Sequence, residues 1–325
     1  MRRVPPPGPH GGDARTVAAA LGRHPDQVLD LSVNTNPFAP DVAPVVTAHL
    51  EAGALARYPD GADQRSATVA MAEALDVAPE RVLLTNGGSE AIALVAAELR
   101  TGWVDEPDFS LYRRHLERLD PSGPRFRSDP TNPTGRLADA DETAEVWDEA
   151  FVPLALGRWS RSLPGGPTPR EAPAVVVGSV TKVLACPGLR LGYAVVPEDD
   201  GASLGHAPLL TRLVRRQPRW SVGTPALLAL PELLAKAELG RWAAQVASAR
   251  SDLVAVLEAH GLTPRPSDAN FVLVDRAPGL RERLAERGVV VRDVTSFGLP
   301  GAVRIAVPDA DGLARLCRAL DEVAQ

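Results

Sequence analysis

The chain contains little cysteine: Cys186 and Cys317 are the two cysteines in 325 residues. Two thiols are too few for a disulfide framework and are typical of a protein from a reducing compartment. Acidic residues outnumber basic ones, and the net charge of −6 argues against a general nucleic-acid surface. The start, MRRVPPPGPHGG, lacks the apolar core of a signal peptide, and no apolar run approaches the length of a membrane span. We therefore expect a cytoplasmic protein without nucleic-acid or membrane partners.

Hydrophobic residues make up 45% of the chain, which is enough for a substantial core in one large or two medium domains. Short apolar runs followed by turn residues at 81–85, 174–179 and 189–196 are typical of buried strands. The first run leads through a glycine turn into SEAIALVAAELR, which has helical spacing. This alternation predicts an α/β fold in which helices cover both faces of a mostly parallel sheet.

The C-terminal part repeats the alternation on a smaller scale. FVLV, VVVRD and AVRIAVP resemble strands, and residues 278–287 and 309–323 are expected to be helices. We expect a large three-layer domain over residues 40–215. The N-terminal segment 1–39 should pack with residues 216–325 to form a smaller α/β domain.

A lysine stands directly after the second apolar run, in Ser179-Val-Thr-Lys182. This placement is unusual because ammonium groups resist burial. A desolvated lysine has a depressed pKa and becomes nucleophilic toward carbonyls. Ser179, Thr181 and the later Arg190 could hold a phosphate beside an aldehyde carbon. The alternative is an ordinary surface loop, because a single motif is weak evidence.

Two turns suggest further ligand contacts. NGGSE begins at Asn86 between the first strand and a helix, where free backbone N–H groups bind anions. The alternative is a plain turn in which Ser89 caps the helix. Asn132-Pro-Thr-Gly135 is typical of a tight turn, and Asn132 could also donate to a phenolic oxygen of a cofactor.

Four other side chains are candidates for the same site. Asp148, in WDEAF, could keep a pyridine nitrogen protonated, although a solvated acidic loop would also fit. Phe109 could stack on a ring and Tyr58 could reach a phosphate, whereas core packing explains most lone aromatics. Arg304, in AVRIAVP, could bind a substrate carboxylate by a bidentate pair, with a surface salt bridge as the alternative.

Together and in this order, the motifs resemble those of the fold-type I aminotransferase superfamily, over nearly the whole chain. The ordered set is Asn36-Pro37, Arg57-Tyr58-Pro59, Gly87-Gly88-Ser89-Glu90, Asn132-Pro-Thr-Gly, Asp148-Glu-Ala, Ser179-x-x-Lys182, Arg190 and Arg304. The resemblance implies pyridoxal phosphate as cofactor, with Lys182 forming the Schiff base and Asp148 pairing with the pyridinium. The other cofactor contacts that it implies are Gly88, Ser89, Glu90, Phe109, Asn132, Ser179, Thr181, Arg190 and Tyr58.

The resemblance also implies a partner. Tyr58 matches a tyrosine that, in this superfamily, reaches the cofactor phosphate of the neighbouring subunit, which implies a homodimer with shared active sites. Arg304 matches the arginine that binds the substrate carboxylate. No metal is expected.

Two subfamilies are similar to this chain: histidinol-phosphate aminotransferase and the threonine-phosphate decarboxylase of cobalamin biosynthesis. The HGG segment at His10, the DxSxNxNP run that includes Asn36, and Phe151 in the DEAF form favour the decarboxylase. The resemblance thus implies decarboxylation of L-threonine O-3-phosphate to aminopropanol phosphate. The alternatives are an aminotransferase for histidinol phosphate or an aromatic amino acid, and a non-catalytic protein of the same fold.

The substrate of either subfamily is a phosphorylated amino acid or amine. Expected substrate contacts are His10, Asn36 and Arg304. Arg113 and Arg114 are further candidates for the substrate phosphate, and the alternative is a solvated helix face.

One departure concerns the segment between Gly135 and Asp148, where twelve residues replace the full helix and strand that relatives usually have. The residues TAEVW before Asp148 are weakly apolar for a central strand. We expect either a trimmed crossover or a local rearrangement of the sheet.

Overall fold

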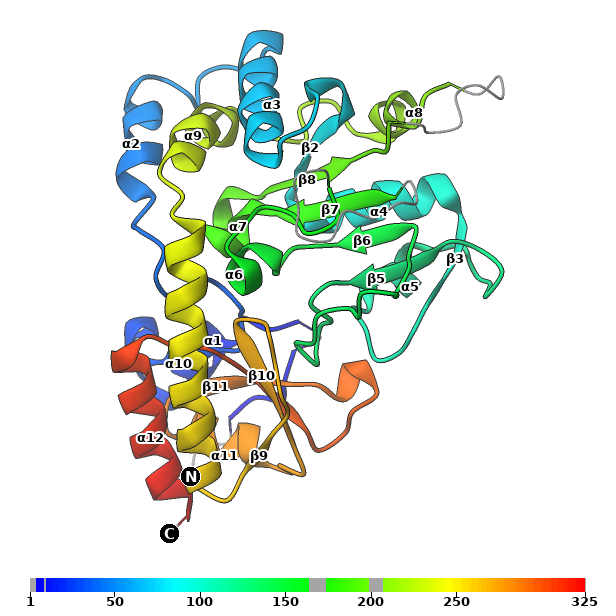
Figure 1. Cartoon of the computed structure of the whole chain (residues 1–325). Helices are drawn as coiled ribbons and strands as arrows, with labels where there is room; N and C mark the ends of the chain where they lie inside the picture. Colours follow the sequence, from blue (N-terminus) through cyan, green and yellow to red (C-terminus); the bar gives the residue numbers. More distant parts are fainter. Residues whose placement is uncertain (1–3, 9, 164–173, 199–206, 325) are drawn as a thin grey trace.

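The computed structural model describes residues 4–8, 10–163, 174–198 and 207–324, and it contains two β-sheets (Figure 1). The larger sheet has seven strands in the order β2-β8-β7-β6-β5-β3-β4. Its strands are β2 (Val82–Asn86), β3 (Thr101–Val104), β4 (Arg118–Leu119), β5 (Arg125–Ser128), β6 (Val146–Asp148), β7 (Val175–Ser179) and β8 (Leu191–Val195). β8 runs antiparallel to both of its neighbours, and the other pairs are parallel. The sheet is therefore mostly parallel, as predicted.

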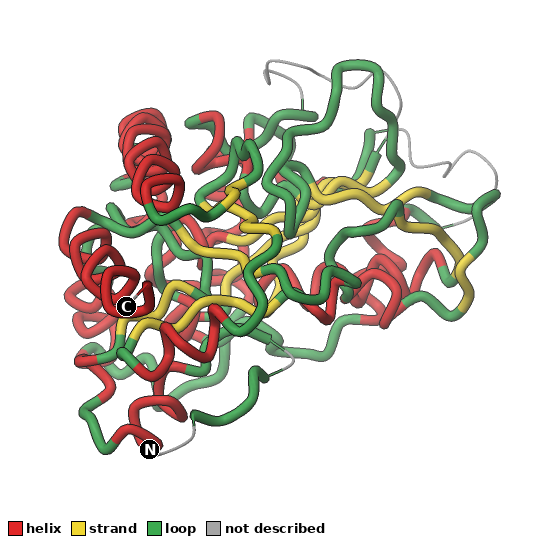
Figure 2. Tube along the Cα trace, turned by 90° about the horizontal axis from the view of Figure 1, so that it is seen from below, coloured by secondary structure: helices red, strands yellow, loops and turns green. Residues whose placement is uncertain are grey.

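Successive strand residues pack on opposite sides of this sheet, which gives three layers. Leu84 and Val176 join a core with α2 (Ala43–Glu51), α3 (Gly61–Leu75) and α9 (Thr224–Ala235). Leu83 and Val175 join another core with α4 (Gly87–Leu99), α5 (Leu111–His115) and α8 (Leu209–Arg216). Figure 2 shows helices on both sides of the strands. None of the helices in the described ranges is long and apolar enough to cross a membrane.

The smaller sheet has five strands in the order β1-β11-β12-β10-β9. They are β1 (Leu29–Leu31), β9 (Thr263–Pro264), β10 (Phe271–Asp275), β11 (Val289–Asp293) and β12 (Val303–Ala306). Around it lie α1 (Ala14–Leu21), α10 (Leu239–Ala259), α11 (Leu280–Glu286) and α12 (Ala310–Ala324). β1 pairs in parallel with β11, so the N-terminal segment contributes an edge strand to a sheet built from the C-terminal part.

The chain leaves the core of the large sheet and enters the core of the small sheet later than residue 215, the expected end of the large domain. α9 packs mainly against α3 and α2, and Leu227 and Leu230 belong to the core of the large sheet. Trp242, near the start of α10, joins the same core, whereas Leu253 and Leu257 join the core of the small sheet. The chain therefore passes between the cores along α10. The sequence of α9 is apolar around most of its circumference, so its spacing could not show which core it enters.

The trimmed crossover lies between β5 and β6. Residues 129–145 contain no helix, although they join two parallel strands. Residues 159–163 pack against this loop: Arg161 Nη1 donates to Asp129 Oδ2 at 2.9 Å and to the Ala138 carbonyl at 2.8 Å. β6 itself is fully buried between β5 and β7. The crossover is thus shortened without loss of the central strand.

The other two α-helices among the described residues are short: α6 (Val152–Leu156) and α7 (Val180–Val183).

Candidate active site

Lys182 lies on α7, which begins directly after β7. Two contacts hold its backbone: the Asn36 N–H donates to the Lys182 carbonyl at 2.9 Å, and Asn36 Nδ2 donates to the Val183 carbonyl at 2.9 Å. Burial, together with the positive charges of Arg304 and Arg190, lowers the pKa of Lys182 to about 8. Lys182 is therefore not a surface-loop lysine, and a buried amine with a lowered pKa is suited to nucleophilic attack.

Three features meet beside Lys182: the glycine turn at Gly87 and Gly88, the hydroxyls of Ser179 and Thr181, and Arg190. A side chain at Gly192 would overlap the backbone of Gly87 and Gly88, and one at Gly87 would overlap the Arg190 guanidinium. Arg190 Nη2 donates to the Asn86 carbonyl at 3.2 Å. The glycines therefore allow the start of α4 and the Arg190 guanidinium to lie close together, an arrangement here called the glycine cradle that is suited to an anion.

Ser179, Thr181 and Gly88 complete this cradle. The hydroxyls of Ser179 and Thr181 lie 2.8 Å apart, and a Cβ on Gly88 would lie 3.5 Å from Ser179 Cβ. Ser89 is exposed in the first turn of α4, and because that helix begins at Gly87, the idea that Ser89 is its N-cap is wrong.

The carboxylate of Glu90 is engaged within the protein. It accepts from the Asn86 N–H at 2.8 Å, from Gln217 Nε2 at 3.1 Å and from Ser221 Oγ at 2.7 Å. These bonds hold the glycine turn in place. A direct contact between Glu90 and the cofactor stays a prediction.

Asp148 ends β6 and is buried, so it is not part of a solvated loop. Its Oδ2 accepts from Tyr112 Oη at 2.9 Å, and its Oδ1 accepts from the Ala150 N–H at 3.0 Å. Burial raises the pKa of Asp148, while these two hydrogen bonds lower it. A buried carboxylate with part of its hydrogen-bonding capacity left can accept from a protonated ring nitrogen.

Asn132 and Arg304 bring the two sheets together. Arg304, on β12, is buried and donates to Asn132 Oδ1 and, at 3.1 Å, to the Ser32 carbonyl. Because Arg304 binds the Asn132 side-chain oxygen, the Asn132 amide nitrogen remains available as a donor. Arg304 also lies over the Phe271 ring, 5.1 Å from its centroid. It is therefore a buried residue between the two sheets and not part of a surface salt bridge.

Arg292 is a candidate site residue that the sequence did not single out. It is buried on β11, and it is the register partner of Arg304 on β12. It donates to the Gly8 carbonyl at 2.9 Å and to Ser296 Oγ at 3.0 Å. Burial lowers the pKa of Arg304 to about 9, and Arg292 contributes to this shift. The available signal was an arginine inside the apolar run VVVRD, the same signal that marked Arg304.

The N-terminal HGG segment lies against the same region. The Gly12 N–H donates to Ser32 Oγ at 2.8 Å, and a Cβ on Gly11 would overlap the Ser32 carbonyl that Arg304 binds. His10 is exposed. The amide of Asn36 is used within the protein, because its oxygen accepts from the Phe38 N–H while its nitrogen holds the Lys182 loop. Substrate contacts by His10 and Asn36 stay predictions.

The predicted aromatic contacts differ in exposure. Phe109 is half-buried and packs edge-to-face on Tyr112, with ring centroids 5.9 Å apart. Tyr58 is 71% exposed and stacks on Trp220 at 4.4 Å. Arg113 and Arg114 are both exposed on α5, and Arg113 pairs with Glu106 at 2.9 Å. The arginines therefore form a solvated helix face.

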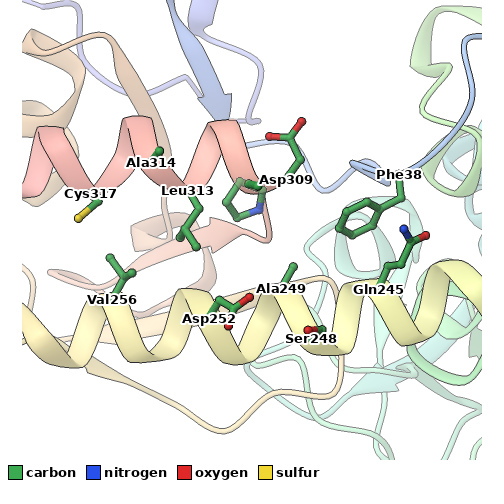
Figure 3. A pocket seen from close by; sticks show the side chains of 12 residues that line it. Phe38, Gln245, Ser248, Ala249, Asp252, Val256, Asp309, Leu313, Ala314 and Cys317 are labelled. Atoms are coloured by element: carbon green, nitrogen blue, oxygen red, sulfur yellow. The ribbon is translucent and has the colours of Figure 1, made fainter.

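A groove of about 530 Å³ lies elsewhere, between α10 and α12 (Figure 3). Leu313 and Val256 contribute apolar surface to it, and Asp252 and Asp309 contribute carboxylates. Its lining contains none of the predicted site residues, and acidic groups suit an anionic substrate poorly. The region around Lys182 is therefore the candidate active site.

Comparison with known proteins agrees with this geometry. The family model for aminotransferase class I and II matches residues 128–320. The histidinol-phosphate aminotransferase of Halobacterium salinarum is 30% identical over 96% of this chain and 95% of its own length. The threonine-phosphate decarboxylase of Salmonella typhimurium is 30% identical over 97% and 96%.

A solved structure supports the fold. Histidinol-phosphate aminotransferase from Sinorhizobium meliloti, in complex with pyridoxal-5′-phosphate, matches with a TM-score of 0.78 at 19% identity, over 98% of this chain and 95% of that one. The chain belongs to the aminotransferase class I and II family. It is a pyridoxal-phosphate-dependent enzyme of this class.

Proposed function

We propose that Lys182, Asp148, Asn132 and the glycine cradle hold pyridoxal phosphate in this chain. The residues present fit the group. The start of α4 offers backbone N–H groups where glycines leave room, and Arg190 adds a positive charge for the phosphate. Asp148 is a buried acceptor for the ring nitrogen, and Asn132 keeps an amide donor for the phenolic oxygen. Phe109 is available to pack against the ring.

The side chains around this site have separable roles. The bound cofactor supplies an electron sink for bonds at the substrate Cα. Asp148 keeps the proton on the ring nitrogen. Lys182 has a pKa of about 8, so its amine can accept and return a proton near neutral pH. Arg304 orients the substrate carboxylate, and this orientation decides which bond to Cα is broken.

The reaction that we propose is decarboxylation of L-threonine O-3-phosphate to aminopropanol phosphate, as in cobalamin-type biosynthesis. The observation that carries it is the pair of buried arginines, Arg292 and Arg304, on neighbouring strands. Such a pair suits a substrate with two anionic groups, here a carboxylate and a phosphate. The Gly8 carbonyl that Arg292 binds and the HGG contact with Ser32 place the N-terminal segment beside this pair.

Phe151 also supports the decarboxylase. It packs edge-to-face on Phe271 at 5.1 Å, on the ring over which Arg304 lies, and it has no hydroxyl to offer the cofactor. The second candidate is an aminotransferase for histidinol phosphate or an aromatic amino acid. It is favoured by the relatives, because most of the similar proteins carry the name histidinol-phosphate aminotransferase.

The two reactions release different products from the holoenzyme. We expect L-threonine O-3-phosphate to release carbon dioxide in equal amount to aminopropanol phosphate. Amino transfer is measured in parallel as glutamate formed from histidinol phosphate and 2-oxoglutarate. Lys182→Ala should abolish the reaction, and Lys236→Ala should retain it, because Lys236 is an exposed residue paired with Glu232.

Each outcome separates the alternatives. Carbon dioxide release without glutamate formation supports the decarboxylase. Glutamate formation without carbon dioxide release overturns it in favour of the aminotransferase. Neither product from protein that has bound the cofactor, together with no glutamate from aromatic amino acids and 2-oxoglutarate, would leave the non-catalytic alternative.

We further propose a cytoplasmic homodimer. Three large apolar side chains, here called the Tyr58 patch, are exposed: Leu55, Tyr58 and Trp220. Leu55 is close to Tyr58 in the sequence, and the Tyr58 ring stacks on the Trp220 ring. Exposed aromatic clusters are typical of interaction surfaces. A partner subunit on this patch would bring its cofactor phosphate within reach of Tyr58.

A further inference from the structure

Asp108 is the centre of a buried hydrogen-bond network beside the predicted cofactor contacts. It is 1% exposed and lies in the loop between β3 and α5. Its Oδ1 accepts from the Phe109 N–H at 2.6 Å and from the Ser128 hydroxyl, and its Oδ2 accepts from the Ser128 N–H at 3.0 Å. Burial raises the pKa of Asp108 to about 7, and these donors offset part of that cost to the ionised form. The carboxylate therefore locks its loop onto the end of β5.

Ser128 transmits this order to two predicted cofactor residues. Its Oγ accepts from the Asn132 N–H at 2.9 Å. On the neighbouring strand, Ser128 is the register partner of Asp148, and the Asp129 N–H that follows it donates to the Asp148 carbonyl at 2.8 Å. The relative positions of the Asn132 amide and the Asp148 carboxylate thus depend on how Ser128 is held.

Tyr112 closes the network from the other side. It is fully buried on α5, which begins three residues after Asp108. Its hydroxyl donates to Asp148 Oδ2 at 2.9 Å, and its ring contacts Phe109. Fixing the loop at Asp108 therefore fixes the residue proposed to pack against the ring and the tyrosine that orients the ring-nitrogen partner.

We propose that Asp108 is a positioning residue for the cofactor, holding Phe109, Asn132 and Asp148 in mutual register through Ser128 and Tyr112. The inference rests on the cofactor placement proposed above. An asparagine side chain at this position would place its NH₂ group against one of the N–H or O–H groups that now donate to the carboxylate. Asparagine therefore keeps the volume of Asp108 but not its set of hydrogen bonds.

The test compares Asp108→Asn and Ser128→Ala with Asp105→Asn, an exposed aspartate of the same loop. Purified apoprotein is titrated with pyridoxal phosphate, and the holoenzyme is titrated with pH while its visible absorbance band is followed. We expect Asp108→Asn to weaken cofactor binding at least about tenfold, because a hydrogen bond of a buried carboxyl group is lost and its donor is left unsatisfied. It should also shift the pKa of the visible band, because Asn132 contacts the phenolic oxygen. Asp105→Asn should change neither quantity.

Ser128→Ala removes the hydroxyl that links Asp108 to the Asn132 N–H and leaves the backbone bond to Asp108, so it should shift both quantities in the same direction. It decides the question if Asp108→Asn does not fold. A lower melting temperature with unchanged cofactor affinity and unchanged band pKa would reduce Asp108 to a purely structural residue and overturn the inference. A wild-type protein that forms no visible band would instead refute the cofactor placement itself.

Discussion

The amine of Lys182 is shaped by its immediate neighbours. Burial disfavours the ammonium form, and Arg304 and Arg190 repel it, whereas Asp30 favours it. Arg304 cannot relieve this repulsion by moving away, because it is tied to Asn132 and to the Ser32 carbonyl. The same arginine that we propose to bind the substrate carboxylate therefore also lowers the pKa of the lysine.

A pH dependence follows for cofactor capture by the apoprotein, because only the neutral amine can attack an aldehyde. The folded pKa of Lys182 is lowered to about 8 from an ordinary 10.5, so the neutral fraction grows as pH rises and is nearly complete above the folded pKa. We expect the capture rate at fixed cofactor concentration to rise about tenfold per pH unit below 8 and then level off. Stopped-flow absorbance measures this rate.

Lys182→Ala and Lys236→Ala provide the matched controls, because these two lysines are the only ones in the sequence. After borohydride reduction, mass spectrometry should find the cofactor on the peptide that contains Lys182. A rate that continues to rise to pH 10, or a label on Lys236, would contradict the assignment.

At the scale of elements, residues 159–163 stabilise the trimmed crossover with buried polar contacts. Glu149, the residue after β6, is fully buried. Its carboxylate accepts from the Arg161 N–H at 3.1 Å and from the Ser162 N–H at 2.9 Å. Arg161 reaches past it to Asp129, which is also fully buried. A charged side chain thus links the segment to the loop that takes the place of a crossover helix.

Arg161→Met should destabilise the protein strongly, since it leaves the buried Asp129 carboxylate without this ionic partner. We expect the free energy of unfolding to fall by about 3 kcal/mol. Urea denaturation followed by circular dichroism measures it. Arg136→Met, in the same loop, removes an exposed pair with Asp268 and should cost less than about 1 kcal/mol.

The double variant Asp129→Asn with Arg161→Met should recover part of the loss, because it removes the buried charge that Arg161 offsets. Equal losses for Arg161→Met and Arg136→Met would mean that the crossover does not depend on the buried pair.

For the whole molecule, the question is whether the active site is complete in one chain. Lys182 and the glycine cradle belong to one subunit, but Tyr58 is exposed and stacked on Trp220 at the surface. If Tyr58 serves a neighbouring site, defects in Lys182 and Tyr58 can be placed in different sites of one dimer.

Co-expression of Lys182→Ala with Tyr58→Ala tests this arrangement. Each variant alone should have little activity, whereas mixed dimers contain one site with both defects and one intact site. With random pairing, activity should return to roughly a quarter of the wild-type value. Sedimentation velocity should show a dimer, and the absence of complementation between dimeric variants would place Tyr58 outside the shared site.

The sequence by itself determined the residues whose role depends on local position. Lys182 and the NGGSE turn follow apolar runs, and Asp148 stands in the ordered set of motifs between them; the ends of neighbouring strands in a mostly parallel sheet meet at one edge. Their order along the chain was enough to predict the class of enzyme and the fold. The short spacing between Gly135 and Asp148 predicted either a trimmed crossover or a rearranged sheet, and the pairing of β6 with β5 and β7 decided for the trimmed crossover.

The tertiary structure decided what depends on register and on packing between distant segments. Arg292 became a site residue because β11 pairs with β12 so that it lies opposite Arg304. Asp108 and Ser128 meet across twenty residues, a contact that no local pattern encodes. Packing between distant segments also decided which core α9 joins, because an apolar helix can pack in either core.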